Sequence, residues 1–75
     1  MNTATKLLEA MTQHPLDWKL DQLQTVAQRH GIVWRQMGTS HCTFVRKDGQ
    51  ILVVPAHRPI NPVYIKKFVQ LVKGR

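Results

Sequence analysis

The sequence predicts an α+β fold in which helices pack on one face of a three-stranded antiparallel sheet. Apolar residues recur every three to four positions over residues 3–30 and 62–73, as in amphipathic helices. Over residues 32–36 and 42–46 they alternate with polar residues instead, as in half-buried strands. The predicted order is α-α-β-β-β-α. All 75 residues should form a single domain, because so short a chain has no room for two cores.

Proline and glycine mark the ends of the two N-terminal helices. The first helix is expected over residues 3–13 and ends before Pro15, because a residue that precedes proline disfavours the helical region. The second is expected over residues 20–30 and ends at Gly31, which readily adopts the left-handed conformation that closes a helix. Between them, Trp18 should anchor the connector against the core.

Three strands and a last helix follow. Residues 32–36 and 42–46 form the first two strands, and Asp48-Gly49 is a strong hairpin signal after the second. Residues 51–55 are almost continuously apolar, which predicts a central, well-covered third strand. The last helix is expected over residues 62–73, capped by the asparagine that precedes it.

The positive charge is concentrated in the second half of the chain. Residues 1–34 contain three basic and three acidic side chains. Residues 35–75 contain eight basic side chains and Asp48 as the one acid, so this half carries the whole formal charge of +7. A concentrated basic field attracts polyanions. Nucleic acid is therefore the leading candidate partner, and an acidic protein is the other.

Composition favours a cytoplasmic protein. The single cysteine, Cys42, cannot form an internal disulfide, which fits a reducing compartment. The longest uncharged stretch, residues 49–56, is far too short to cross a bilayer, and the first residues do not follow the pattern of a secretory signal. We therefore expect a cytoplasmic location and no membrane partner.

Several familiar kinds of site are disfavoured. The histidines and the cysteine lack the His-x-x-x-His or Cys-x-x-Cys spacing of zinc sites, so we expect no metal and no other cofactor. Ser40 and His41 are adjacent, so their side chains tend to diverge, which argues against a serine-hydrolase triad. Gly38 alone does not make a phosphate-binding loop.

His41 remains as the candidate for chemistry, in a glycine-containing loop of the basic half. Histidine gains and loses a proton near neutral pH, and RNA cleavage needs only a base for the 2′-hydroxyl and cations for the phosphate. A histidine in a loop is, however, usually a solvated residue without a role. His57 has the same two interpretations: a second proton carrier or phosphate contact, or simply a residue of a turn.

Basic side chains near these histidines are the candidates for phosphate binding. The candidates are Arg35, Arg46, Lys47, Arg58, Lys66 and Lys67. The two lysines of the last helix fit an ordinary solvated helix face equally well.

The order of motifs in the second half of the chain resembles that of a known family. Trp34-Arg-Gln-Met-Gly-Thr-Ser-His-Cys-Thr-Phe44, the Asp48-Gly49 turn, Val53-Val-Pro-Ala-His57 and the closing helix resemble the HicA toxins. These are small bacterial mRNA endoribonucleases (mRNA interferases) of type II toxin–antitoxin systems. The resemblance covers roughly residues 20–75, and it implies a fold like the double-stranded-RNA-binding domain.

The resemblance also implies roles for particular residues. In the HicA family the histidine of a Gly-Ser-His motif, at the start of the second strand, is catalytic. This implies that His41 is the general base or acid of a metal-independent endoribonuclease. Gly38 and Ser40 match the rest of the motif, and His57 matches a Val-Pro-x-His element that the family often carries. The implied substrate is mRNA, and the implied protein partner is a HicB-like antitoxin.

Two departures from the family pattern are present. Thr39 separates the glycine from the serine, although the spacing from His41 to Phe44 is kept. Residues 1–19, an extra helix and connector, have no counterpart in the shortest members and either fill the core or contact a partner. The competing hypothesis is a non-catalytic RNA-binding module of double-stranded-RNA-binding type. A DNA-binding protein, or a structural partner of an acidic protein, ranks last.

Overall fold

The computed structural model describes residues 3–37, 41–56 and 59–74, and the predicted class and element order are confirmed in it. The elements are α1 (Thr3–Gln13), α2 (Leu20–Arg29), β1 (Val33–Met37), β2 (His41–Val45), β3 (Ile51–Pro55) and α3 (Pro62–Lys73). No helix in the described part of the chain is long and apolar enough to span a membrane.

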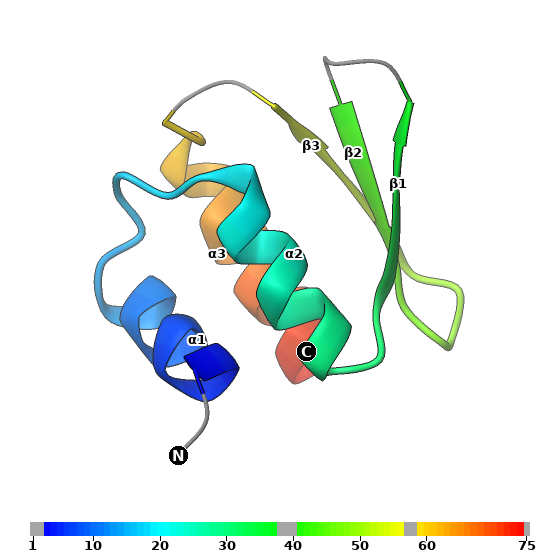
Figure 1. Ribbon diagram of the computed structural model, residues 1–75, viewed down its shortest axis with the longest axis horizontal. Helices are drawn as coiled ribbons and strands as arrows, with labels where there is room; N and C mark the ends of the chain where they lie inside the picture. The colour runs from blue at the N-terminus through cyan, green and yellow to red at the C-terminus, as the bar shows by residue number, and fades with distance from the viewer. Residues whose placement is uncertain (1–2, 38–40, 57–58, 75) are drawn as a thin grey trace.

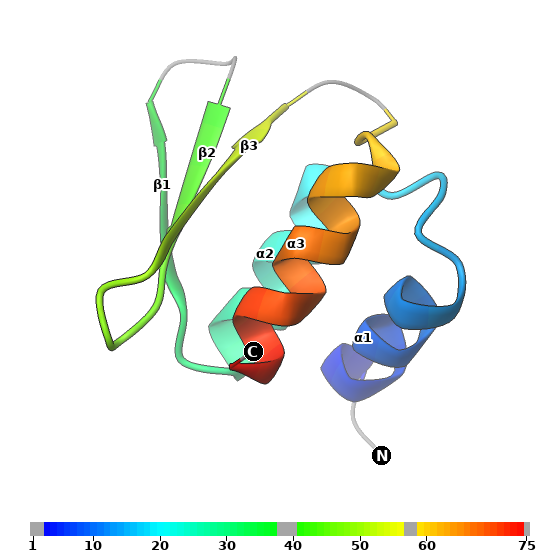
Figure 2. The same cartoon turned by 180° about the vertical axis from the view of Figure 1, so that it is seen from behind.

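The elements form three layers. The sheet is one outer layer and α1 is the other. Between them, α2 and α3 lie side by side against one face of the sheet (Figure 1). The reverse view shows the same arrangement (Figure 2). The helices therefore lie on one side of the sheet, as predicted, and no described helix covers the other face.

The strands form an antiparallel meander in the order β1-β2-β3. The prediction that residues 51–55 are a central, well-covered strand is wrong, because β3 is an edge strand and β2 is the central one. Side chains alternate between the faces of a sheet, so only part of the apolar run of β3 points to the helices. Ile51 and Val53 lie on the uncovered face and are 62% and 46% exposed.

One core draws side chains from every layer. Its fully buried members include Leu23 of α2, Phe44 of β2 and Phe68 of α3, and the two phenylalanine rings meet edge to face with centroids 5.0 Å apart. Met11 of α1 and Trp18 of the connector belong to the same cluster. Within residues 1–19, the described helix and connector therefore contribute to the core, the first of the two roles expected for this segment.

The connector and the ends of the helices are held by hydrogen bonds. The indole Nε1 of Trp18 donates to the carbonyl oxygen of His14 at 2.6 Å, and the backbone N–H of Ile60 donates to the carbonyl oxygen of Trp18 at 3.0 Å. The predicted anchoring role of Trp18 is confirmed. Asn61 caps α3, since its Oδ1 accepts a hydrogen bond from the backbone N–H of Val63 at 2.9 Å.

Candidate active site

His41 is the first residue of the central strand. Its Cα partners are Met37 in β1 and Pro55 in β3, so its backbone is flanked by a strand on both sides. Cys42 and Phe44, which have the opposite parity to His41 in the strand, are completely buried against the helices. Since side chains alternate along a strand, His41 lies on the uncovered face of the sheet, and its side chain is exposed. A paired backbone thus presents this imidazole to solvent.

Cys42 holds the beginning of β2 against α2. The amide Nε2 of Gln24 donates to the Cys42 Sγ at 3.7 Å and to the Gln36 Oε1 at 3.3 Å, which ties α2 to both β2 and β1. Burial raises the pKa of the Cys42 thiol, and the hydrogen bond from Gln24 opposes this effect only in part. The thiolate is the nucleophilic form, so Cys42 is a structural residue.

Arg35 is the basic residue that the sheet brings nearest to His41. It lies opposite Thr43 in the register, two residues before the partner of His41, and its side chain is exposed. Arg35 and His41 are therefore diagonal neighbours on the same face, at about 7–8 Å, which long side chains can bridge. Strand residues 33–37, 41–45 and 51–55 contain no acid, so no carboxylate from the strands neutralises this pair.

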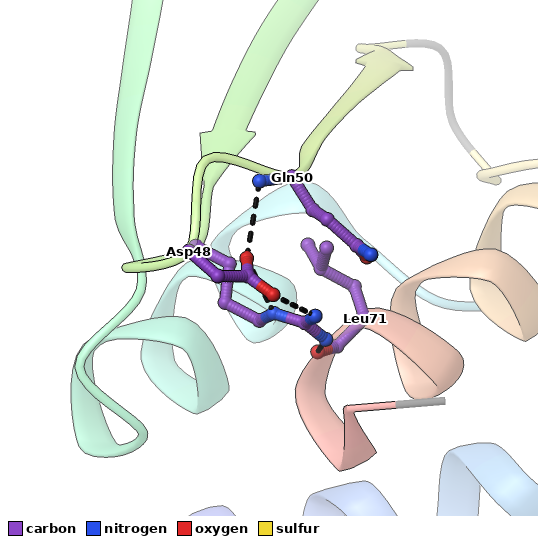
Figure 3. Close-up of polar contacts among 4 residues, drawn as sticks. Asp48, Gln50 and Leu71 are labelled. Carbon is purple, nitrogen blue, oxygen red and sulfur yellow. Dashed lines mark hydrogen bonds and ion pairs between the residues drawn. The ribbon is translucent and has the colours of Figure 1, made fainter.

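Arg46 occupies a different environment, at the hairpin that joins β2 to β3. Its guanidinium forms an ion pair with Asp48, and its Nη1 donates to the carbonyl oxygen of Leu71 near the end of α3 at 2.9 Å (Figure 3). The side chain is only 18% exposed. Arg46 therefore links the hairpin to a helix, and a phosphate would have to compete with these partners.

Asp48 completes this arrangement. Its Oδ1 accepts hydrogen bonds from the Arg46 Nε at 2.9 Å and from the backbone N–H of Gln50 at 3.1 Å (Figure 3). These contacts, the one from Arg46 first, hold the pKa of the Asp48 carboxyl at about 2, below its ordinary value of 3.8. Gly49 completes the turn with φ of +94°, a conformation that glycine adopts freely.

The hairpin lies far from His41. Lys47 is exposed there, alongside Gly31, where a Cβ would lie 3.6 Å from the lysine Cε. Arg46 and Lys47 follow His41 by five and six positions along extended chain, which corresponds to roughly 15–20 Å. The structure therefore does not bring Arg46 and Lys47 to the same phosphate as His41.

The end of the sheet that carries His41 is electrostatically suited to anions. Both α2 and α3 begin at this end and run toward the hairpin, so their positive dipole ends lie here (Figures 1 and 2). Lys66 and Lys67 are exposed in the first half of α3. The Lys67 Nζ lies 6.0 Å from the centroid of the Tyr64 ring.

Several predicted residues lie outside the described part of the chain. These are Gly38, Ser40, His57 and Arg58, together with the inserted Thr39. Within residues 3–37, 41–56 and 59–74, no three His, Cys, Asp or Glu side chains gather where a metal ion could be held.

The uncovered sheet face also carries an aliphatic surface that the sequence interpretation missed. Val33 and Ile51 are 64% and 62% exposed, and they line a hollow of 440 Å³ together with Arg35, Thr43 and Val45. The signal was available in the alternation of each strand, since Thr43 and Val45 share the parity of His41. The exposed aliphatic surface was not predicted because residues 51–55 were expected to form a covered, central strand.

No family model matches the chain, and neither the curated proteins nor the solved structures include a match to it.

Proposed function

We propose that this protein is a HicA-like toxin that cleaves mRNA without a metal, with His41 as its catalytic residue. One observation carries the proposal: His41 is exposed at the start of the central strand, on the uncovered face, with Arg35 beside it and no strand carboxylate near it. The resemblance in residues 20–75 adds the expectation that the fold is a variant of the double-stranded-RNA-binding domain.

The chemistry requires a proton acceptor and a cation. Neutral His41 would take the proton of a 2′-hydroxyl as that oxygen attacks the adjacent phosphorus. The bond from phosphorus to the 5′-oxygen then breaks, and the leaving oxygen takes a proton from an acid, either His41 in its protonated form or a second group. Arg35 would stabilise the charge that develops on the phosphoryl oxygens. The products are a 2′,3′-cyclic phosphate and a 5′-hydroxyl.

The other predicted cations would bind the RNA backbone. Lys66 and Lys67 lie on the helix that begins at the His41 end of the sheet, so they suit nucleotides next to the cleaved one. Lys47 would contact a more distant phosphate, and Arg58 belongs to the same expected set, whereas Arg46 is already engaged by Asp48 and Leu71.

The test is cleavage of a defined mRNA by the purified chain in EDTA, with His41→Ala and His14→Ala compared. His14 is also exposed, but it lies at the end of α1, behind the helix layer. We expect cyclic-phosphate products from the wild-type chain and from His14→Ala, and none from His41→Ala. Equal cleavage by all three proteins would remove His41 from the mechanism.

The alternative, a non-catalytic RNA-binding module, gives a different result in the same experiment. RNA would bind with a steep dependence on salt and would remain intact, and His41→Ala would change neither property.

The implied HicB-like antitoxin fits the aliphatic part of the uncovered face. Val33, Ile51 and Val53 expose apolar surface that an RNA backbone would not use, with Arg35 beside them. A chain with a formal charge of +7 attracts an acidic protein and repels its own copies. We therefore propose an acidic antitoxin as the occupant of this face.

A further inference from the structure

A small hollow lies at the end of β3 and has no role in the proposals above. It has a volume of 340 Å³ and is lined by Pro55, Pro59, Asn61 and Tyr64. Pockets that bind drug-sized molecules span about 300–1,000 Å³, so this one suits a single small ring system. Tyr64 is half-buried in α3, and its position in the first turns of the helix places it near the strand end.

The hollow is close to His41. Pro55, one of its walls, is the direct Cα partner of His41 in the register of β2 and β3. Residues paired in this way lie about 4.5–5.5 Å apart. A nucleotide whose phosphate reached His41 would therefore place a neighbouring base at the mouth of the hollow.

The walls of the hollow are held in place by contacts outside it. Ile60, between Pro59 and Asn61, is buried, and its backbone N–H donates to the carbonyl oxygen of Trp18 at 3.0 Å. The Asn61 Oδ1 accepts from the backbone N–H of Val63 at 2.9 Å, which orients the amide. That bond uses the acceptor of the amide and not its amino group, which is the group that could donate to the edge of a base.

The groups around the hollow are those that recognise an unpaired nucleotide. An aromatic ring offers a stacking surface, two prolines offer apolar walls, and an amide offers a polar contact to a base edge. The Lys67 Nζ, 6.0 Å from the centroid of the Tyr64 ring, adds a cation for the phosphate that flanks a stacked base.

We propose that this hollow is a base-binding subsite, in which Tyr64 stacks on the nucleobase next to the cleaved phosphate of single-stranded RNA. The inference rests on the proposed RNA substrate and extends it, because it assigns selection of the cleavage position to Tyr64 and Asn61.

The test measures binding and cleavage separately. Binding uses the full chain with His41→Ala and single-stranded RNA hexamers in which 2-aminopurine replaces one base at a time. We expect quenching of 2-aminopurine at the position next to the cleaved bond, because this base loses fluorescence when it stacks. Tyr64→Leu should abolish the quenching and raise Kd about tenfold, whereas Tyr64→Phe, which keeps the ring, should retain both properties.

A second variant guards against misfolding. Asn61→Asp keeps an N-cap side chain of equal quality, so the helix and the fold should persist. It removes the amino donor and adds a negative charge beside the phosphate, so Kd should rise at least as much as in Tyr64→Leu. Val63→Leu, at a position that is 53% exposed and does not line the hollow, is the control and should bind like the parent.

Outcomes for the subsite and for the nuclease are distinguishable. If Tyr64→Leu and Asn61→Asp bind and cleave RNA as the wild-type chain does, while His41→Ala is inactive, the subsite is disproved and the nuclease stands. If wild-type chain leaves RNA intact but Tyr64→Leu still weakens binding, the subsite stands and catalysis fails. Absence of RNA binding by the wild-type chain overturns both. Loss of antitoxin binding alone in the Tyr64 variant would assign the hollow to a protein and overturn the subsite.

Discussion

The two faces of the sheet use neighbouring residues of the same strand for opposite purposes. Cys42 and Phe44 face the helices and are completely buried, whereas His41 and Thr43 alternate with them on the uncovered face. The covered face is mainly apolar, with the exposed Gln36 bonded to Gln24 of α2 beside Cys42. The uncovered face combines an imidazole and a guanidinium with exposed aliphatic side chains. Stability and the proposed activity are therefore separated by residue parity, so substitutions can affect one without the other.

The same separation applies to two arginines. Arg35 lies on the uncovered face next to His41. Arg46 continues the parity of Cys42 and Phe44, and its guanidinium turns to the helix side, where it meets the carbonyl oxygen of Leu71. Two arginines that count equally toward the net charge thus have different partners. Only Arg35 is placed to serve the candidate active site.

The largest effect on stability is expected on the covered face. Phe44→Ala removes a buried ring from its contact with Phe68, and such a truncation costs about 3–5 kcal/mol. The total free energy of unfolding of a chain of this length is roughly 4–11 kcal/mol, so much of the variant should be unfolded. Urea denaturation followed by circular dichroism measures the change. Thr43→Ala, one residue away on the other face, should shift the free energy of unfolding by no more than about 0.5 kcal/mol; equal losses would contradict the separation of the faces.

Periodicity predicted most of the fold, and its one clear error concerned coverage. The helix spacing, the Asp48-Gly49 turn and the proline and glycine signals lie in local sequence, and each element was found close to its expected place. The position of β3 depends on which strand lies between the other two, a long-range property. An apolar run occurs both in a central strand and in an edge strand with an aliphatic outer face, so residues 51–55 could not distinguish them.

The candidate site was predictable only in part, for a similar reason. The position of His41 at the start of β2 followed from its motif. The pairing that places Arg35 beside it, and the distance that separates Lys47 from it, depend on strand register. The hydrogen bond from Arg46 to the carbonyl oxygen of Leu71 joins residues that lie 25 positions apart in the chain, so no local pattern could predict it.

The next effect separates the two arginines. Arg35→Gln should lower the rate of RNA cleavage about 100-fold, because it removes a charged donor to the phosphate, and it should leave the urea midpoint unchanged. Arg46→Gln should lower the urea midpoint and leave the rate of RNA cleavage unchanged. It breaks the ion pair with Asp48 and the bond to Leu71 but leaves the His41 end intact. Cleavage rates and urea curves of both variants give the comparison. Loss of cleavage in Arg46→Gln with normal stability would assign it to RNA binding instead.

A smaller effect should distinguish partner binding from catalysis on the uncovered face itself. Ile51→Asp places a negative charge within the aliphatic surface, four residues along β3 from the partner of His41, so it should weaken binding of an acidic antitoxin by about tenfold or more while RNA cleavage persists. Val63→Asp is the matched control, because Val63 is exposed to a similar extent but belongs to α3. Co-purification with the product of the neighbouring reading frame, and the Kd of the pair, measure the effect. Equal weakening by both substitutions would place the antitoxin elsewhere.

The smallest effect concerns pH and tests whether the hairpin ion pair stabilises the covered side. The Asp48 carboxyl has a pKa of about 2 in the folded chain, below its ordinary value of 3.8, so the unfolded chain takes up this proton first as the pH falls. Its stabilising contribution is therefore complete above about pH 4 and disappears as the pH falls through 2. Asp48→Asn keeps an acceptor for the backbone N–H of Gln50 but lacks the charge. The difference in urea midpoint between the wild-type chain and this variant should be constant above pH 4 and shrink steadily toward pH 2.

In an Arg46→Gln background the same comparison should show little dependence on pH, because the main cause of the lowered pKa is gone. A difference that stays constant down to pH 2 in the wild-type background would show that the ion pair does not stabilise the fold.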